Sequence, residues 1–380
     1  MRRVDISPRR NWQKRVEEVG LTFHTAGGVA YWNEAACYEL TAAQVDELEL
    51  ATNTLHGLCL EAVQHVIDHK LYGRMGIPPH AVPLIERAWE AEPPAIYGRF
   101  DLSYDGKTPP RMLEYNADTP TSLLEAAVAQ WFWLQDVAPG ADQFNSIHER
   151  LLAAWGELKP YLRGNVLYFA SLDDPEDGMT ATYLQDTAHQ AGIATEYIRV
   201  HDIGWNAGRG EFVDGLMRPM ESVFKLYPWE WMVHEEFGEH LGQSATQWIE
   251  PAWKMVLSNK GILPVLWELF PECPYLLPAY FEAAPLARRR PRAQAAPLAR
   301  RGQRHRPRRR AHAGRHRRRL RRGGVRVPGL RAPPRLRRAP AGDRELGDRA
   351  GGRRHRHPRK RRRGDRQLQP LRPPPLPVKP

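Results

Sequence analysis

Hydrophobic and polar positions in the first 280 residues follow the periods of both helices and strands. Residues 41–72 repeat apolar positions with the helical period. Residues 166–170 (V-L-Y-F-A) form a short apolar run that is typical of a buried strand, and residues 180–191 and 193–200 are typical of a helix and a second strand. This order of strand, loop, helix and strand predicts a Rossmann-like unit at about residues 160–205 in an α/β (α+β) protein.

A second pattern, at residues 97–116, predicts a β-hairpin. Apolar and polar residues alternate on both sides of an Asp-Gly dipeptide, which is a common hairpin turn. Because side chains alternate between the two faces of a strand, Glu114 and Asn116 share a face, and folding about the turn brings Asp101 roughly opposite Glu114. Two carboxylates are therefore expected to face each other across the hairpin.

Opposed carboxylates need solvent or a cation, because like charges directly across a ladder destabilise it. The oxygens of Asp101, Glu114 and Asn116 are the kind of ligand that Mg²⁺ takes, together with water and substrate phosphate. The alternative is a solvated polar face on which Arg99 serves as the counter-ion, and spacing alone favours this alternative.

Three further segments lie where a ligand could bind. Residues 119–122 (T-P-T-S) precede an apolar run and predict a helix capped by hydroxyl groups. Such an N-terminus can bind a carboxylate or phosphate, although spacing favours an ordinary cap. The acidic loop at residues 173–177 follows the buried strand, where open α/β sheets place ligands, and no Gly-rich loop accompanies it to bind a dinucleotide. Lys260, before an apolar helix-like run, suits either a phosphate partner or a plain surface position.

Composition divides the chain near residue 285. Residues 286–380 contain 35 of the 56 Lys and Arg but only 4 of the 44 Asp and Glu, a net charge of +31, whereas the preceding residues carry −19. The formal charge of +12 therefore describes neither part, and it supports no argument for nucleic-acid binding.

Residues 283–380 contain no Phe, Tyr or Trp and consist mainly of Arg, Pro, Ala and Gly. Such a segment buries too little apolar surface to offset its chain entropy, so it is predicted to be a disordered, low-complexity tail. One interpretation is a basic arm that binds nucleic acid, if only non-specifically. The interpretation that we favour is translation in the wrong reading frame, because these four residues have codons made of G and C.

The genetic code supports the second interpretation. If each true codon begins at the second base of the codon as written, residues 292–306 are compatible with V-R-K-P-L-L-S-R-D-G-A-N-V-T-V. Residues 365–377 are compatible with I-G-N-F-S-R-F-V-P-H-L-F-R followed by a stop codon, and residues 343–360 can contain A-G-x-I-G-I-R-E. One inserted base, or an equivalent change, is therefore predicted just after Phe281.

Cysteine usage and hydropathy exclude several classes of protein. Cys37, Cys59 and Cys273 have no C-x-x-C spacing, which argues against a structural zinc site or a disulfide scaffold and favours a reducing cytoplasm. The N-terminus lacks the apolar region of a signal peptide. No apolar run reaches the roughly 18 residues of a transmembrane helix. A cytoplasmic protein without a membrane partner is expected.

Four motifs together resemble the glutathionylspermidine synthase family: R-F-D (99–101), E-Y-N-A-D-T-P-T-S (114–122), E-P-A-W-K (250–254) and S-N-K-G-I-L-P-V-L-W (258–267). The resemblance covers nearly all of residues 1–282 and points to the stand-alone, synthetase-like members, which lack an amidase domain. It implies an ATP-grasp ligase with a pre-ATP-grasp, Rossmann-like domain. In such ligases ATP and Mg²⁺ convert a carboxylate into an acyl phosphate, which an amine attacks. The implied partners are a glutathione-like acid and a polyamine-like amine.

The resemblance also implies a catalytic centre on the predicted hairpin. Asp101, Glu114 and Asn116 resemble the Mg²⁺ ligands of the family. Arg99 resembles the catalytic group that binds substrate and stabilises the transition state. Metal ions and cationic side chains suit this chemistry because they neutralise charge as the phosphoryl group moves.

The remaining site residues implied by the resemblance concern substrates and ATP. Thr119 and Thr121 occupy positions where family serines contact the glutathione-like acid, so the identity of the acid stays open. Glu176 and Asp177 fall near the expected amine site. Lys260 resembles a lysine that contacts the ATP phosphates.

The chain departs from the family beyond residue 282. The ATP-grasp fold of the family continues through a K-P strand, an S-R-E-G-A-N phosphate loop and a terminal G-I-R-E strand, none of which is present in the chain as written. Each has a counterpart in the alternative reading frame. The intact gene is therefore expected to encode an ATP-dependent carboxylate–amine ligase, and the 380-residue chain is expected to be inactive or impaired.

Overall fold

A computed structural model describes residues 1–282; the predicted disordered tail and the shifted reading frame lie outside the described residues. The helices are α1 (Trp12–Glu18), α2 (Ala42–Asp68), α3 (Val82–Ala91), α4 (Gln130–Val137), α5 (Ile147–Leu158), α6 (Pro175–Gln190), α7 (Trp229–Met232), α8 (Lys254–Ser258) and α9 (Ile262–Leu269). The strands are β1 (Arg2–Asp5), β2 (Thr25–Ala26), β3 (Val29–Ala30), β4 (Ala36–Glu39), β5 (Arg99–Ser103), β6 (Arg111–Asn116), β7 (Leu167–Ser171), β8 (Thr195–Arg199), β9 (Gly204–Asn206), β10 (Glu211–Val213), β11 (Ser222–Leu226) and β12 (Gln247–Ile249). Within this part of the chain no helix is long and apolar enough to cross a membrane.

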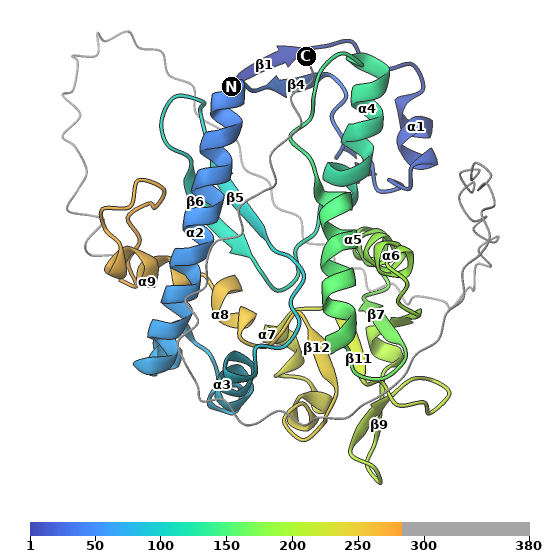
Figure 1. The fold of residues 1–380 in the computed structure, drawn as a ribbon, viewed down its shortest axis with the longest axis vertical. Helices are drawn as coiled ribbons and strands as arrows, with labels where there is room; N and C mark the ends of the chain where they lie inside the picture. Colours follow the sequence, from blue (N-terminus) through green and yellow to red (C-terminus); the bar gives the residue numbers. More distant parts are fainter. Residues whose placement is uncertain (283–380) are drawn as a thin grey trace, which may run out of the picture. The chain divides into compact units, whose positions relative to one another are not determined.

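The centre of the fold is a four-stranded parallel sheet in the order β12-β11-β7-β8 (Figure 1). The predicted strands at 166–170 and 193–200 are β7 and β8, and α6 connects them, so the mixture of helices and strands agrees with the predicted α/β class. Parallel strands with helices on both sides are buried on both faces, which explains why every residue of β7 and of β11 is buried.

Helix α6 begins at Pro175, earlier than the predicted helix at residue 180. The Asp174 carboxylate caps it by accepting hydrogen bonds from the backbone N–H groups of Glu176 at 2.9 Å and Asp177 at 3.4 Å. The prediction that Glu176 and Asp177 belong to a loop is therefore wrong: both lie in the first turn of the helix. Their side chains are consequently held by helical geometry.

The two faces of the sheet pack into two separate hydrophobic clusters. Leu167 and Phe169 of β7 pack in one cluster with α5 and α6, whereas Tyr168 and Ala170 pack in the other with α2, α3, α8 and α9. This division follows directly from the two-residue period of a strand. The hairpin therefore lies in the same layer as α2, on the Tyr168 side of the sheet.

Strands β5 and β6 form the predicted hairpin, and Asp101 is paired with Glu114 in the register, as expected. The opposite face of the hairpin packs in the core, where the rings of Phe100 and Tyr115 stack with centroids 3.9 Å apart. A Cβ at Gly98 would lie 2.6 Å from the Tyr115 ring, so only glycine allows the chain to enter β5 this closely. The hairpin is thus fixed from its buried side.

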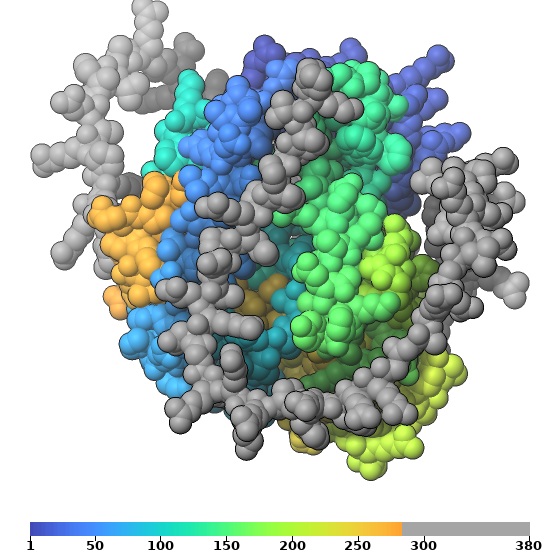
Figure 2. All heavy atoms as spheres, viewed as in Figure 1, coloured from blue at the N-terminus to red at the C-terminus, as the bar shows by residue number. Residues whose placement is uncertain are grey.

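Helix α2 passes alongside the hairpin, and α9 packs against α2 (Figure 1). The predicted helix over residues 41–72 corresponds to α2, which begins with a reciprocal capping box between Thr41 and Gln44 and is followed by a separate 3₁₀ turn at Leu71–Met75. In the space-filling view, blue residues of α2 and green residues of α4 and α5 border a depression with teal and orange residues deeper inside it (Figure 2).

The predicted hydroxyl cap after residues 119–122 is not formed. Ser122 has φ 63°, in the left-handed region, and no described side chain caps the π-helical turn Glu125–Ala129 that precedes α4. The hydroxyls of Thr121 and Ser122 lie 3.4 and 3.5 Å from the guanidinium of Arg99 instead. This segment therefore faces the hairpin rather than the helix that follows it.

A buried ion pair joins the hairpin to the central sheet. The carboxylate of Asp118, two residues after β6, accepts a hydrogen bond from the ammonium of Lys225 in β11 and another from the backbone N–H of Trp229 at 2.7 Å. The side chains of Asp118 and Lys225 are 4% and 1% exposed. Burial lowers the pKa of Lys225, and the charge of Asp118 opposes this shift.

We expect Asp118→Ala or Lys225→Met to lower the free energy of unfolding by about 3–5 kcal/mol, because either change leaves a buried charge without its partner. Urea denaturation of each variant measures this loss. Glu39→Gln breaks the exposed pair with Arg2 and should cost less than about 1 kcal/mol. If the single variants of the buried pair unfold like Glu39→Gln, the pair does not hold the hairpin to the sheet.

Candidate functional site

The polar face of the hairpin carries Arg99, Asp101, Glu114 and Asn116 together. Arg99 pairs with Asn116 in the register, as Asp101 does with Glu114, so the four side chains share one face. Arg99 Nε donates a hydrogen bond to Asp101 Oδ1 at 2.9 Å, and the side chains of this pair are 35% and 38% exposed. The predicted counter-ion is therefore present, and Asp101 stays accessible.

Glu114 is held by two groups from opposite directions. The amide of Asn116 donates to Glu114 Oε1 at 2.9 Å, and the ammonium of Lys260 donates to Glu114 Oε2. These two donors hold the pKa of Glu114 below its ordinary value, so its carboxylate is ionised at neutral pH. Lys260 lies 146 residues after Glu114 in the sequence, and its side chain is 75% exposed. It therefore reaches the hairpin from the solvent side.

The segment at residues 119–122 faces the guanidinium of Arg99. Arg99 Nη1 donates to the Thr121 carbonyl at 3.1 Å and lies 3.4 Å from the Thr121 hydroxyl. Thr119 is half-buried at the start of the same segment. Arg99 is thereby shared between the carboxylate of Asp101 and the hydroxyl-bearing segment, and it joins the predicted metal ligands to the predicted acid site.

Two tyrosines connect this segment to the first turn of α6. The Tyr97 hydroxyl donates to the Pro120 carbonyl at 2.5 Å; burial first, and then the charges of Glu250 and Asp177, raise the pKa of Tyr97. The Tyr31 hydroxyl donates to Glu125 at 2.8 Å; burial first, and then Glu125 and Glu176, raise its pKa to about 12. Glu176 and Asp177 therefore lie within electrostatic range of the 119–122 segment.

Burial raises the pKa of Asp177 from 3.8 to about 6, and the neighbouring charges of Asp174 and Glu176 add to the shift. The first turn of α6 thus concentrates three carboxylates. Near neutral pH one of them is close to its protonation equilibrium. A cationic group placed beside them would be bound and would return the pKa of Asp177 toward its ordinary value.

Three residues that position the site were missed from the sequence, although they belong to the quoted motifs. Glu250, which is fully buried, accepts hydrogen bonds from the backbone N–H groups of Ile96 at 3.0 Å and Tyr97 at 3.1 Å, and it pairs with Lys254. Lys254 also donates to the Tyr97 carbonyl at 2.8 Å. These bonds fix the segment that leads into β5 at Arg99.

Ser258 performs the same task at the other end of the hairpin. Its hydroxyl oxygen accepts hydrogen bonds from the backbone N–H groups of Ala117 at 3.1 Å and Asp118 at 2.9 Å. The S-N-K motif is thereby attached to the E-Y-N-A-D motif, which explains how Lys260 meets Glu114. The signal available in the sequence was polar residues, Glu250, Lys254 and Ser258, set among apolar neighbours, where burial requires a partner.

The oxygen atoms on the hairpin fit a magnesium ion. Two carboxylates, from Asp101 and Glu114, and the amide oxygen of Asn116, which its own hydrogen bond leaves free, form a set with the chemistry that Mg²⁺ selects. No cluster of three or more His, Cys, Asp or Glu residues suited to a metal occurs in residues 1–282, so a mainly protein-made cage is not present there. A magnesium ion that also binds substrate phosphates usually takes only one or two carboxylates from the protein.

The chain belongs to the glutathionylspermidine synthase preATP-grasp family, whose model it matches over residues 3–307. A Haemophilus influenzae protein provisionally named an acid–amine ligase is 42% identical over 289 residues, covering 74% of this chain and 73% of that protein. The bifunctional glutathionylspermidine synthetase/amidase of Escherichia coli is 28% identical, covering 64% of this chain and 43% of that protein.

More distant relatives extend the comparison. The glutathionylspermidine synthase of Crithidia fasciculata is 27% identical, covering 65% of this chain and 39% of that protein. This chain therefore spans less than half the length of the Escherichia coli and Crithidia proteins. A solved glutathione synthetase-like effector from Globodera pallida aligns with a TM-score of 0.43 and 12% identity, covering 70% of this chain and 69% of that one.

We expect Asp177→Asn to stabilise the protein above pH 6. An aspartate whose pKa is raised in the folded state, to about 6 here, contributes stability that is full below its unfolded pKa near 4 and is lost as pH rises through 6. The free energy of unfolding of the parent, measured with urea between pH 4 and 7, should therefore fall relative to that of the variant. Asp186→Asn, further along α6, is the matched control; equal pH profiles for all three proteins would contradict the shifted pKa.

Proposed function

We propose that the described region is the carboxylate-activating part of an ATP-dependent carboxylate–amine ligase. The observation that carries the proposal is the pairing of Asp101 with Glu114 across the hairpin, with Arg99 and Lys260 already bound to these carboxylates. Opposed carboxylates on a half-exposed face are costly unless cations compensate them. Membership of the family supplies the reaction class.

In this proposal each side chain of the hairpin face has a specific task. Asp101, Glu114 and Asn116 would hold Mg²⁺, which supplies neutralisation of phosphate charge. Arg99 binds the acid and stabilises charge on the transferring group, since its guanidinium lies between Asp101 and Thr121. Lys260, whose side chain is exposed beside Glu114, would contact the ATP phosphates.

In this proposal two segments bind the substrates. Thr119 and Thr121 orient the acid, and Glu176 and Asp177 bind the amine as a cation at the first turn of α6. The relatives named for glutathionylspermidine support a glutathione-like acid and a polyamine-like amine. A base is needed before an amine can attack, and a carboxylate whose pKa is raised to about 6, as at Asp177, suits that task.

The 380-residue chain itself is proposed to be inactive or impaired. Beyond residue 282 its sequence contains neither the K-P strand nor the phosphate loop nor the G-I-R-E strand of the family. The hairpin face would therefore carry only part of the proposed site. The groups that enclose ATP from the opposite side would be missing. Catalysis of phosphoryl transfer depends on positioning and charge neutralisation. Loss of the groups on these three missing segments would therefore remove most of the rate.

Deleting one base just after the codon for Phe281 tests the proposal about the reading frame. We expect the repaired protein to form an amide from an acid and an amine with ATP consumption, and the 380-residue chain to show no turnover above background. Resequencing the gene across this junction accompanies the assay. Turnover by the 380-residue chain equal to that of the repaired protein would contradict the proposed loss.

In the repaired protein, Asp101→Asn and Glu114→Gln should each lower kcat by about a hundredfold or more, because charge neutralisation by a bound metal is worth several kcal/mol. Steady-state assays at varied Mg²⁺ should show a raised Mg²⁺ requirement. Asp105→Asn changes a carboxylate in the turn of the same hairpin, where it caps Lys107 and Thr108, and should leave kcat unchanged. Equal effects of all three substitutions would exclude a metal site on this face.

A further inference from the structure

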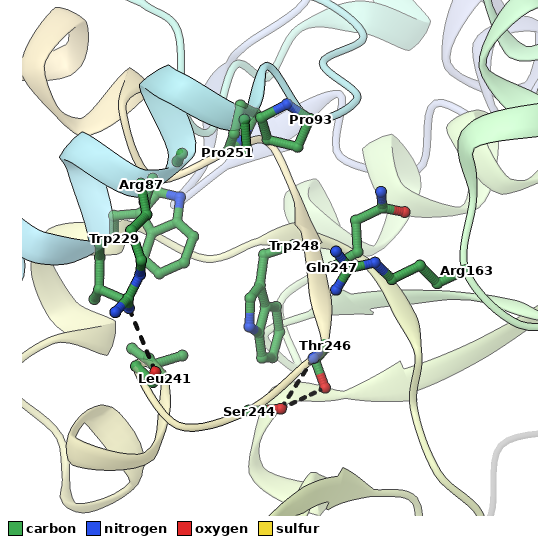
Figure 3. Close-up of a pocket in the computed structure, with 15 residues that line it drawn as sticks. Arg87, Pro93, Arg163, Trp229, Leu241, Ser244, Thr246, Gln247, Trp248 and Pro251 are labelled. Atoms are coloured by element: carbon green, nitrogen blue, oxygen red, sulfur yellow. Dashed lines mark hydrogen bonds between the residues drawn. The ribbon is translucent and has the colours of Figure 1, made fainter.

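A pocket of about 220 Å³ lies between α3, the edge strand β12 and the segment 241–246 (Figure 3). None of the nine residues proposed for the ligase site lines it. Its walls are partly apolar and include Leu84, Ala88, Pro93 and Pro251, of which the two prolines lie next to each other in Figure 3. The pocket is therefore separate from the hairpin face, and the ligase proposal does not use it.

The rim of this pocket is positively charged. Arg87 and Arg163 both line it, and both are exposed at the surface. Arg87 Nη2 donates only a long hydrogen bond, 3.4 Å, to the Gly242 carbonyl, and Arg163 donates to the Ala245 carbonyl. Neither guanidinium pairs with a carboxylate in the described part of the chain, and no lining residue is acidic. The rim thus offers cationic donors whose charge is not neutralised.

Trp248 adds an unused donor inside the pocket. Its side chain lines the pocket, only 8% of the residue is exposed, and its Nε1 has no hydrogen-bond partner among residues 1–282. The neighbouring polar groups are already used: the Thr246 hydroxyl donates to Met220 at 2.8 Å, and the Gln247 amide donates to Tyr161 at 3.1 Å. A buried N–H without a partner is unfavourable, and an acceptor from a ligand would remove that cost.

The indole of Trp248 is also held in position. It makes edge contacts with Phe212 and Trp229, at centroid distances of 5.2 and 6.4 Å. In Figure 3 it lies between the side chains of Arg87 and Arg163. The unpaired N–H therefore cannot readily turn toward another partner, whereas Arg87 and Arg163 are exposed side chains at the rim.

We propose that this pocket binds a small dicarboxylate. One carboxylate is held by Arg87 and Arg163 at the rim, the carbon chain packs against Leu84 and Ala88, and an oxygen of the second carboxylate accepts the hydrogen bond of Trp248. A bare oxyanion such as phosphate satisfies the arginines but leaves the apolar wall and the indole N–H unused. The volume admits a molecule of this size.

Isothermal titration of the full-length protein with succinate and glutarate tests this proposal. We expect at least one of them to bind with a Kd of about 1 mM or tighter, and propionate, which lacks the second carboxylate, to bind about tenfold more weakly. Trp248→Phe keeps the ring and removes the N–H, so it should weaken the dicarboxylate about fivefold and leave propionate unchanged. Arg87→Gln and Arg163→Gln should weaken both ligands about fivefold.

Arg209→Gln is the matched control, because Arg209 is 67% exposed and lies outside the pocket. Binding of anions to the many other basic residues is common to all variants, and this control measures it. Circular dichroism checks that each variant is folded. The proposal is overturned if neither dicarboxylate binds at about 10 mM, if phosphate binds as tightly as they do, or if Arg87→Gln, Arg163→Gln and Trp248→Phe bind them like Arg209→Gln.

Discussion

A lysine in the middle of a fully buried strand must be paired, because an isolated ammonium in the core costs several kcal/mol. Lys225 meets this requirement through Asp118, which also accepts the backbone N–H of Trp229. Since Asp118 lies two residues after Asn116, the last residue of β6, the pair draws the end of the hairpin to the centre of the parallel sheet. The position of the hairpin face is thereby set by the sheet rather than by the turn.

The other positioning contacts act in the same way and use the same kind of group. Glu250 follows β12 and accepts hydrogen bonds from the segment just before β5. Ser258 accepts hydrogen bonds from the segment just after β6. Both ends of the hairpin are thus attached to one short stretch of chain that also carries Lys260. A buried ion pair contributes little net stability, but the loss of one partner is severe, so such groups specify geometry more than they add free energy.

The sequence allowed prediction of features that depend on neighbours along the chain. Strand β7, helix α2 and the pairing of Asp101 with Glu114 follow from hydrophobic period and turn chemistry, and the structure has all three. It did not allow prediction of contacts between distant segments, such as Ser258 with Ala117, because no local pattern records them. The predicted start of α6 at residue 180 is too late because Asp174 caps the helix, which places the acidic residues after it in the first turn.

The two interpretations of the hairpin face, a counter-ion pair and a metal site, are compatible in physical terms. The structure has the counter-ions in place: Arg99 on Asp101 and Lys260 on Glu114. Both pairs are substantially exposed, and exposed pairs are worth about 1 kcal/mol or less, so a divalent cation can displace them cheaply. The buried pairs at Asp118 and Glu250 cannot be exchanged in this way. In the proposed site, the buried ion pairs therefore set the shape, and the exposed ion pairs are the ones that a cation would replace.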